Sequence, residues 1–198
     1  MNDVKKLSPV ANLGQRLREL RKKHKLSLES LSARALVSVG MLSHIERNQT
    51  TPSLKTLDRI CVALGVEMAN LFPPQALKSS QSDAHVIQVD QRPRLEFPSL
   101  GISKVLLSAS HRKTLEVFLV VIVPNGGTGD EPMVRGGEKA GLVVGGRLRL
   151  TIGTHVHELC EGDSFHFDSS VPHQLRNISD EEASVLWIIR PNQLGNEM

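Results

Sequence analysis

The spacing of apolar residues changes once along the chain, close to Phe72. Before that point they recur at intervals of three and four, the period of one face of an α-helix. From His85 onward they alternate or form short runs, which is typical of β-strands. All five Phe residues and the single Trp187 lie at or after Phe72. We therefore predict an α + β chain of two domains, helical over 12–73 and β-stranded over 85–194, with a polar linker at 74–84.

The first domain has the spacing of five short helices packed as a bundle. Ser27 and Ser38 stand directly before apolar stripes, where their hydroxyl groups can cap a helix N-terminus. Gly65 ends the fourth stripe, and a short fifth stripe precedes Pro73. The predicted helices are about Asn12–His24, Ser27–Ala35, Ser38–Arg47, Pro52–Gly65 and Val66–Phe72.

The second domain reads as many short strands separated by Gly-rich turns. A spacing of about ten residues between successive strands favours an antiparallel β-sandwich or barrel. The predicted strands are His85–Val89, Ile102–Ser108, Leu115–Val123, Gly141–Val144, Arg147–Ile152, His155–Leu159, Ser164–Phe167, His173–Ile178 and Ser184–Ile189.

The balance of charged residues changes at the same place as the spacing of apolar residues. The formal net charge of the 198 residues is +3, but residues 1–73 have a balance of +6 and residues 74–198 one of −3. An asymmetry of this kind indicates that the helical domain meets a polyanion and the β domain does not. The N-terminal stretch lacks the apolar core of a signal peptide, and no apolar run is long enough to span a bilayer. We expect a cytoplasmic protein without a membrane partner, with Cys61 and Cys160 as reduced thiols.

Residues 12–72 resemble the helix-turn-helix domain of phage repressors and the bacterial regulators built on it. The resemblance rests on Leu31, the Ser38-Val39 helix start, the Ile45-Glu46-Arg47 segment and the Pro-Ser-Leu helix from Pro52. This chain has Leu36 at the interhelical turn, where the family usually has Gly. In such domains the third helix enters the major groove of DNA.

The resemblance also implies roles for individual residues of this domain. Glu46 is expected to be structural, and Arg16 through Lys25 form a basic run whose alternative reading is a solvated face. The residues expected to face bases are Val39, Gly40, Ser43 and His44, and those expected to touch phosphate are Ser38, Arg47, Asn48 and Lys55.

Residues 125–177 resemble a cupin, a double-stranded β-helix barrel. The second cupin motif is nearly intact from Gly162-Asp163 through Pro172-His173 to Asn177, but the first is preserved only as a frame. The resemblance places Met133, Arg135 and Lys139 where cupins have two histidines and a glutamate. A thioether and two cations do not replace imidazole and carboxylate ligands, so we expect neither a metal nor another cofactor, and no catalytic residue.

The same substitutions predict a basic interior suited to a small anion such as a carboxylate. The alternative is that Arg135, Lys139 or both point to solvent from the Gly136-Gly137 loop. His155 and His157 have metal-like spacing but lie outside the cupin ligand positions, so we interpret them as a surface or partly buried pair. The predicted effector-binding residues are Met133, Arg135, Lys139, His173, Leu175 and Asn177.

The two domains together resemble bacterial one-component transcription regulators, in which an XRE-type helix-turn-helix domain is fused to a C-terminal cupin sensor domain. This implies an operator in double-stranded DNA, a small-molecule effector, repression by default, and a homodimer formed through strands such as Leu115–Val123. Two alternatives stay open. One is a cupin enzyme with an accessory DNA-binding domain, and the other is a DNA-binding protein whose β domain only dimerises.

Overall fold

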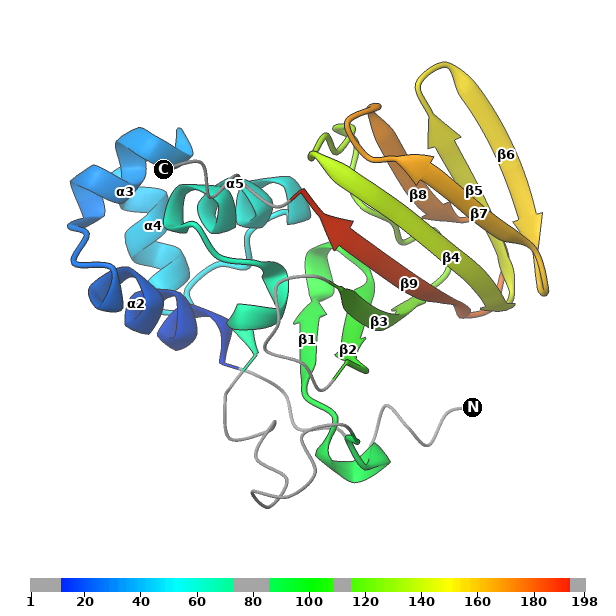
Figure 1. The fold of residues 1–198 in the computed structure, drawn as a ribbon, viewed down its shortest axis with the longest axis horizontal. Helices are drawn as coiled ribbons and strands as arrows, with labels where there is room; N and C mark the ends of the chain where they lie inside the picture. The colour runs from blue at the N-terminus through cyan, green and yellow to red at the C-terminus, as the bar shows by residue number, and fades with distance from the viewer. Residues whose placement is uncertain (1–11, 73–85, 109–114, 193–198) are drawn as a thin grey trace.

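The computed structural model describes residues 12–72, 86–108 and 115–192. We call 12–72 the helical domain and 86–192 the β domain. They lie side by side, with one helix and one short turn of the helical domain against the β domain (Figure 1). None of the helices in the described ranges has the length and apolar character needed to span a bilayer.

The helical domain contains four α-helices within its described residues, each begun by a capping side chain. Asn12, Ser27, Ser38 and Ser53 each accept a hydrogen bond from a backbone N–H in the first helical turn, as predicted for Ser27 and Ser38. Gly65 ends the last helix in the left-handed conformation. The helices are α2 (Leu13–Lys23), α3 (Leu28–Ala35), α4 (Val39–Glu46) and α5 (Leu54–Leu64).

The predicted fifth helix is wrong. Within Val66–Phe72 the chain forms only the 3-10 turn η1 (Met68–Leu71). The Asn70 side chain accepts a hydrogen bond from the Glu67 N–H, which closes this turn after a single repeat. Phe72 is extended because the residue before a proline is disfavoured in the helical conformation, and Pro73 follows it.

The β domain consists of two antiparallel sheets. The first has six strands in the order β1-β2-β3-β9-β4-β7, and the second has three in the order β6-β5-β8. Leu148 and Leu150 of the second sheet and Phe118, Val185 and Trp187 of the first fill the space between them. The strands are β1 (Arg94–Phe97), β2 (Ile102–Leu106), β3 (Glu116–Ile122), β4 (Gly137–Gly145), β5 (Arg147–Ile152), β6 (His155–Cys160), β7 (Ser164–Asp168), β8 (His173–Asn177) and β9 (Ala183–Pro191).

The expected closed barrel is not formed by the described strands. Along the edge where the two sheets would join, residues 123–136 pass beside β8 and make only two isolated bridges, Gly127 to Arg176 and Met133 to His173. This segment is rich in Gly and contains Pro124 and Pro132, which interrupt a continuous ladder. The sheets are therefore layered, and these bridges hold the junction together with backbone hydrogen bonds from Thr128 to Leu175 and from Arg135 to Ser169.

The start of the β domain also differs from the prediction. Only residues 86–89 of the strand expected at His85–Val89 are described, and they lead into the 3-10 turn η3 (Val89–Gln91). The first strand is β1, which sequence reasoning missed because it has four residues between Pro93 and Pro98 and then enters the turn η4 (Pro98–Leu100). The alternation of Leu95 and Phe97 is too short to register as a strand.

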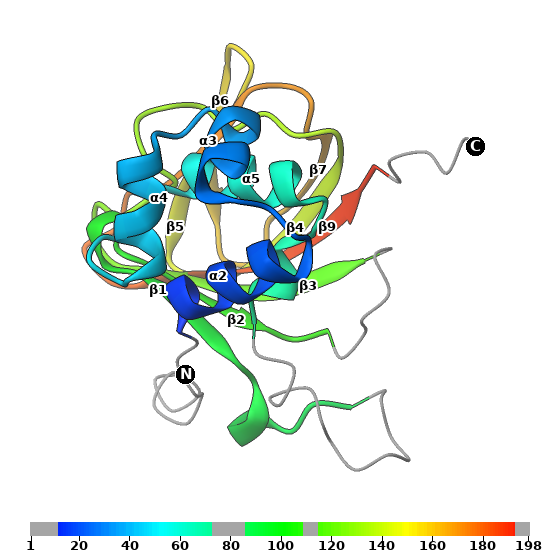
Figure 2. The same ribbon diagram turned by 90° about the vertical axis from the view of Figure 1, so that its left-hand side faces the viewer.

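The apolar cores of the two domains are continuous. Phe72 and Phe118 stack with ring centroids 6.0 Å apart, and Leu54 and Met68 belong to the same buried cluster as the β-domain core. Seen from the helical side, α3 and α4 lie in front of α5 (Figure 2). The C-terminal end of α4 also comes near the β domain, because Ile45 lines a surface depression together with Glu96 and Pro98.

Leu36 at the interhelical turn adopts the left-handed conformation, with φ 53° and ψ 43°, and is 77% exposed. A left-handed backbone costs a side-chain-bearing residue about 1–2 kcal/mol, whereas glycine adopts it freely but loses more entropy on folding. We predict that Leu36→Gly raises the free energy of unfolding by roughly 0.5–1 kcal/mol in urea titrations. Leu36→Ala is the matched control, because it shortens the side chain but keeps a Cβ atom in the left-handed conformation. Equal stability of the two variants would show that the left-handed backbone of residue 36 carries no strain.

Candidate DNA-binding surface and interior anion site

Helix α4 presents a short polar surface at its N-terminal end. The Ser38 hydroxyl caps the helix by accepting from the Met41 N–H at 3.2 Å, and Leu42 and Ile45 are buried on the inner side. The predicted base-facing residues lie on the other side. Val39, Gly40 and His44 are exposed, and Ser43 is half-buried.

A buried ion pair fixes α4 against α2. Arg21 donates from Nε and Nη2 to the two oxygens of Glu46 at 2.6 and 2.8 Å, and from Nη1 to the Leu26 carbonyl. These hydrogen bonds to Glu46 raise the pKa of Arg21 above its usual value. The pair is bidentate, so it fixes the orientation of the Arg21 guanidinium plane and of the Glu46 carboxylate plane. Glu46 therefore has the structural role expected for it, and Arg21 is removed from the basic surface.

The four residues predicted to contact phosphate differ in their surroundings. Ser38 and Arg47 are exposed at the two ends of α4. Asn48 has a left-handed backbone, and its side-chain oxygen accepts from the Gly14 N–H at 3.0 Å, so it ties the α4 turn to the start of α2. Lys55 pairs with Glu131 of the β domain, with Nζ and Oε2 2.6 Å apart. The Lys55 side chain is 42% exposed, so this pair lies at the surface.

The basic run Arg16 through Lys25 divides between packing and solvent. Arg16 donates to the Asn70 carbonyl and to Glu19, and Arg21 is buried. The other cations of the run are exposed at the surface of α2 and the turn after it. These exposed residues are Arg18, Lys22, Lys23 and Lys25.

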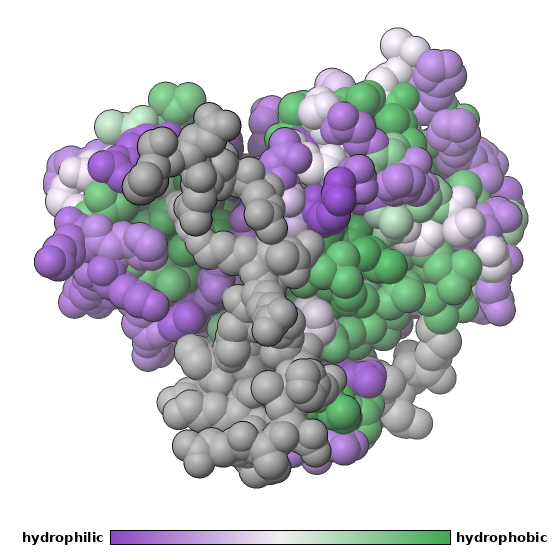
Figure 3. Space-filling view, viewed as in Figure 1, coloured by the Kyte–Doolittle hydropathy of each residue, from purple (hydrophilic) through white to green (hydrophobic). Residues whose placement is uncertain are grey.

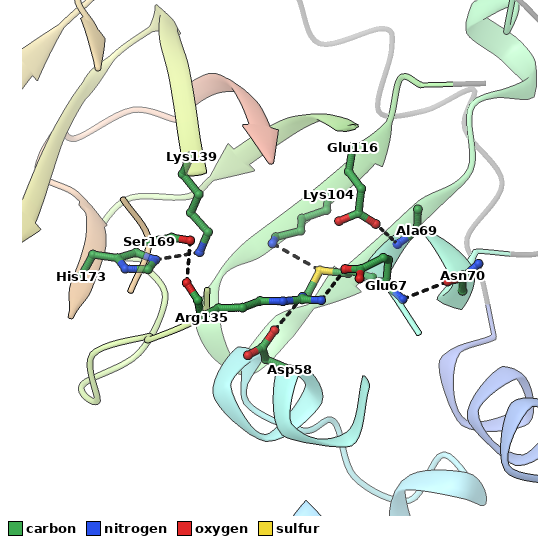
Figure 4. A network of polar contacts seen from close by, with 11 residues as sticks. Asp58, Glu67, Ala69, Asn70, Lys104, Glu116, Arg135, Lys139, Ser169 and His173 are labelled. Carbon is green, nitrogen blue, oxygen red and sulfur yellow. Dashed lines mark hydrogen bonds and ion pairs between the residues drawn. The ribbon is translucent and has the colours of Figure 1, made fainter. Parts of the chain in front are cut away.

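In the β domain, His173 and Lys139 form a buried pair. Lys139 Nζ lies 2.7 Å from His173 Nε2, and His173 Nδ1 lies 2.8 Å from the Val171 carbonyl oxygen (Figure 4). A carbonyl can only accept, so Nδ1 carries the proton and Nε2 accepts from Lys139. Burial, with the Lys139 charge, lowers the pKa of His173 to about 4. Burial, with the charges of Lys104 and Arg135, lowers the pKa of Lys139 to about 7.

These residues do not fit a cupin metal centre. The Nε2 atom of His173, which would coordinate a metal, is engaged by Lys139, and the neighbouring side chains at the other ligand positions are Met133 and Arg135. Divalent ions of this fold class need imidazole and carboxylate donors. Within the described ranges no three His, Cys, Asp or Glu side chains gather as a potential metal site, and His155 and His157 are exposed on β6.

Arg135 reaches across the seam between the domains. Its side chain is only 12% exposed, and its guanidinium pairs with Asp58 of α5 at 2.8 Å and with Glu67 beside η1. Against the effect of burial, the two carboxylates raise the pKa of Arg135. Sequence reasoning placed Arg135 in a basic interior or at the solvent. It did not foresee that the helical domain supplies its counter-ions.

Two further buried charges were missed. Lys104 of β2 is 6% exposed, and its Nζ lies 3.5 Å from Met68 Sδ and 5.6 Å from the centre of the Phe118 ring. Glu116 of β3 accepts from the Ala69 N–H through Oε1, while Oε2 is buried without a hydrogen-bond partner among the described residues. Burial lowers the pKa of Lys104 to about 8 and raises that of Glu116 to about 7. The only signal in the sequence was a charged residue inside each apolar strand.

The basic side chains line a small cavity, which we call the interior cavity. Its volume is about 30 Å³, and Lys104, Arg135, Lys139 and His173 are on its wall with residues of both domains. The predicted effector residues Met133 and Leu175 also line it. A larger, open depression of about 440 Å³ lies elsewhere on the β domain, beside Arg149 and Arg176.

The predicted effector residue Asn177 has a different setting. Its side chain donates to the carbonyls of Ile122 and Glu181 and accepts from Ser179, and it is not on the wall of the interior cavity. Asn177 holds the turn after β8 in place. Its contacts are those of a structural residue.

Comparison with known families identifies both domains. Residues 17–71 match the helix-turn-helix family, and residues 118–189 match the cupin domain family. The chain thus carries a helix-turn-helix domain followed by a C-terminal cupin domain.

Relatives with curated descriptions are transcription regulators. The HTH-type transcriptional regulator PuuR of Escherichia coli is 26% identical over 167 residues, which are 84% of this chain and 88% of PuuR. The regulator SutR of the same organism is 27% identical over 83% of this chain and 86% of its own. A solved structure of an HTH_3 family transcriptional regulator from Vibrio cholerae, 24% identical, covers 92% of this chain and 97% of its own with a TM-score of 0.71. It confirms the two-domain fold.

The Lys139–His173 contact predicts a measurable coupling. If the Lys139 charge helps to keep His173 neutral, Lys139→Met raises the His173 pKa, which nonetheless stays below 6.5 because burial persists. Imidazole chemical shifts followed by NMR between pH 3 and 8 measure this pKa. Lys139→Arg is the control that keeps a cation. An unchanged His173 pKa in Lys139→Met would show that the two groups are not coupled.

Proposed function

We propose that this protein is a sequence-specific DNA-binding transcriptional regulator, acting by default as a repressor, whose cupin domain binds a small anionic effector without a metal. The observation that carries the DNA-binding part is α4, whose buried face is braced by Arg21 and Glu46 while Val39, Gly40 and His44 stay exposed at its N-terminal end. A braced helix with a free N-terminal surface is what entry into the major groove requires. The regulator relatives support the same reading.

The side chains that line the interior cavity favour an anion as the effector. Lys104, Arg135 and Lys139 bring three basic groups to one small volume, and among the described residues the hydrogen-bond partner of the Lys104 ammonium is a thioether, not a carboxylate. Charge-assisted hydrogen bonds from such groups are strongest where water is excluded. An effector changes operator affinity only to the extent that it binds two arrangements of the protein differently.

The interior cavity supports binding better than catalysis. A catalytic site needs a base and an electrophile in reach of a substrate. Here the imidazole of His173 is occupied on both nitrogens, by Lys139 and by the Val171 carbonyl. We therefore favour a regulator over the alternative of an enzyme with an accessory DNA-binding domain.

A homodimer is proposed through the outer face of the six-stranded sheet. Leu142 of β4 lies opposite Leu186 of β9, which lies opposite Leu119 of β3, and Ile188 stands between Val117 and Ala140 in the same way. These side chains form an apolar area over β3, β4 and β9 (Figure 3). Contiguous apolar surface of this kind is typical of an interface. A second copy fits it because helix-turn-helix proteins read paired half-sites.

Operator recognition is tested with a sequence selected from random DNA by the full chain. We expect His44→Ala to change the preferred sequence, because this residue is exposed on α4 and the resemblance places it toward the bases. We expect Arg47→Ala to weaken binding to all sequences alike and to reduce the salt slope by about 1. Arg176→Ala, an exposed arginine of the β domain, is the control for net charge. An unchanged sequence preference in His44→Ala would remove this residue from readout, and failure of the wild type to select any sequence would overturn the proposed function.

The dimer is tested at Leu142, whose side chain is 41% exposed. Leu142→Asp places a charge within the apolar face, so we expect a dimer of the wild type to become a monomer in light scattering coupled to size exclusion. Val156→Asp introduces the same charge on β6 of the other sheet, where the residue is 58% exposed, and should leave the dimer intact. A dimeric Leu142→Asp variant would place the interface elsewhere.

A further inference from the structure

The wall of the interior cavity is completed by the helical domain. Leu54 and Asp58 of α5 and Met68 of η1 line it together with residues of both β-domain sheets. Figure 4 shows Arg135 lying between the two domains, with its guanidinium directed at Asp58 and Glu67 and its backbone held by Ser169. The site proposed for an anion therefore already contacts two carboxylates of the same chain.

The charges on the two sides of this seam are complementary. Around the interior cavity, the described part of the β domain contributes Lys104, Arg135 and Lys139 and one buried carboxylate, that of Glu116. The helical domain contributes Asp58, which is buried, and Glu67, whose side chain is 15% exposed. Buried charges are tolerated only when they are paired, so the β-domain cations need carboxylates from outside their own domain.

The volume of the interior cavity limits what can share it with the docked helical domain. At about 30 Å³ it has room for about two water molecules. Succinate has eight non-hydrogen atoms and needs several times that space. A carboxylate ligand of this size needs part of the wall to move, and α5 and η1 are the part that belongs to the helical domain.

We propose that Asp58 and Glu67 act as a tethered internal ligand of the anion site, and that a small carboxylate effector replaces them and releases the helical domain from the β domain. This inference rests on the proposed function and assigns its regulation. Occupancy of the interior and docking of the helical domain are then mutually exclusive states of one equilibrium.

Release also changes the DNA-binding surface. In the docked arrangement Lys55, a predicted phosphate contact, is paired with Glu131 of the β domain. Moving the helical domain away breaks this pair and frees the ammonium group. Effector binding at one end of the seam is thereby connected to the electrostatics of the DNA-binding domain at the other.

The probe is succinate, titrated by calorimetry into the full chain and into Asp58→Asn/Glu67→Gln. If the carboxylates compete with the probe, the double variant binds succinate about tenfold or more tightly than the wild type, because a docked population of 90% or more reduces apparent affinity by that factor. Glu19→Gln/Glu29→Gln removes two exposed charges from the same domain and should leave succinate affinity as in the wild type. Small-angle X-ray scattering of the wild type should show a larger radius of gyration with succinate than without.

A second variant separates competition from loss of structure. Arg135→Gln removes the partner that both carboxylates share, so it should enlarge the radius of gyration without ligand and weaken succinate binding. Helical content by circular dichroism confirms that each variant is folded. Opposite effects of the two variants on succinate affinity support the proposal, and weakening by both would make Asp58 and Glu67 structural and overturn it.

Other outcomes are equally decisive. Tighter binding without a change in the radius of gyration would reject release of the helical domain. Equal succinate binding by the wild type and Asp58→Asn/Glu67→Gln would reject competition while leaving the anion site of the proposed function intact. Absence of succinate binding in every form would reject both the competition and the carboxylate effector. Operator binding, measured in parallel, shows separately whether the DNA-binding function stands.

Discussion

The pairing of Arg135 with Asp58 and Glu67 is the interaction on which the relation between the two domains depends. It joins a loop of the β domain to α5 and to the residue before η1, and it is nearly excluded from water. Removing one side of such a pair leaves an uncompensated buried charge, which is far more costly than the loss of a surface salt bridge. The seam therefore depends on both partners of this pair being present.

The same pairing explains why a cupin interior without metal ligands keeps so many polar groups. Lys139 contacts His173, Lys104 packs on Met68 and Phe118, and Glu116 accepts from the backbone of η1. Each of these contacts lies on or beside the seam. An apolar interior would give stability without any response to a ligand, whereas this arrangement makes docking depend on charge.

The parts of the fold that depend on local patterning could be predicted from the sequence. Helix starts at Ser27 and Ser38, the stop at Gly65 and the strand Arg147–Ile152 all follow from capping chemistry and alternation. The fifth helix failed because one side-chain hydrogen bond and a following proline decided the outcome within seven residues. The prediction of a closed barrel was wrong because closure depends on the path of the Gly-rich segment 123–136, which has no periodicity.

The candidate sites show the same division. The exposed end of α4 was predictable from the resemblance to helix-turn-helix domains, with Leu42 and Ile45 on the inward face. The surroundings of Lys104 and Glu116 and the counter-ions of Arg135 depend on contacts between residues 30 to 80 positions apart in the sequence, which no local pattern indicates.

The most direct measurement uses the Ala69 N–H, which is donated to Glu116 across the seam. Its hydrogen-exchange rate with saturating succinate should rise in the wild type while the amides of α4 stay unchanged; a slower or unchanged rate at Ala69 would contradict the release of the helical domain.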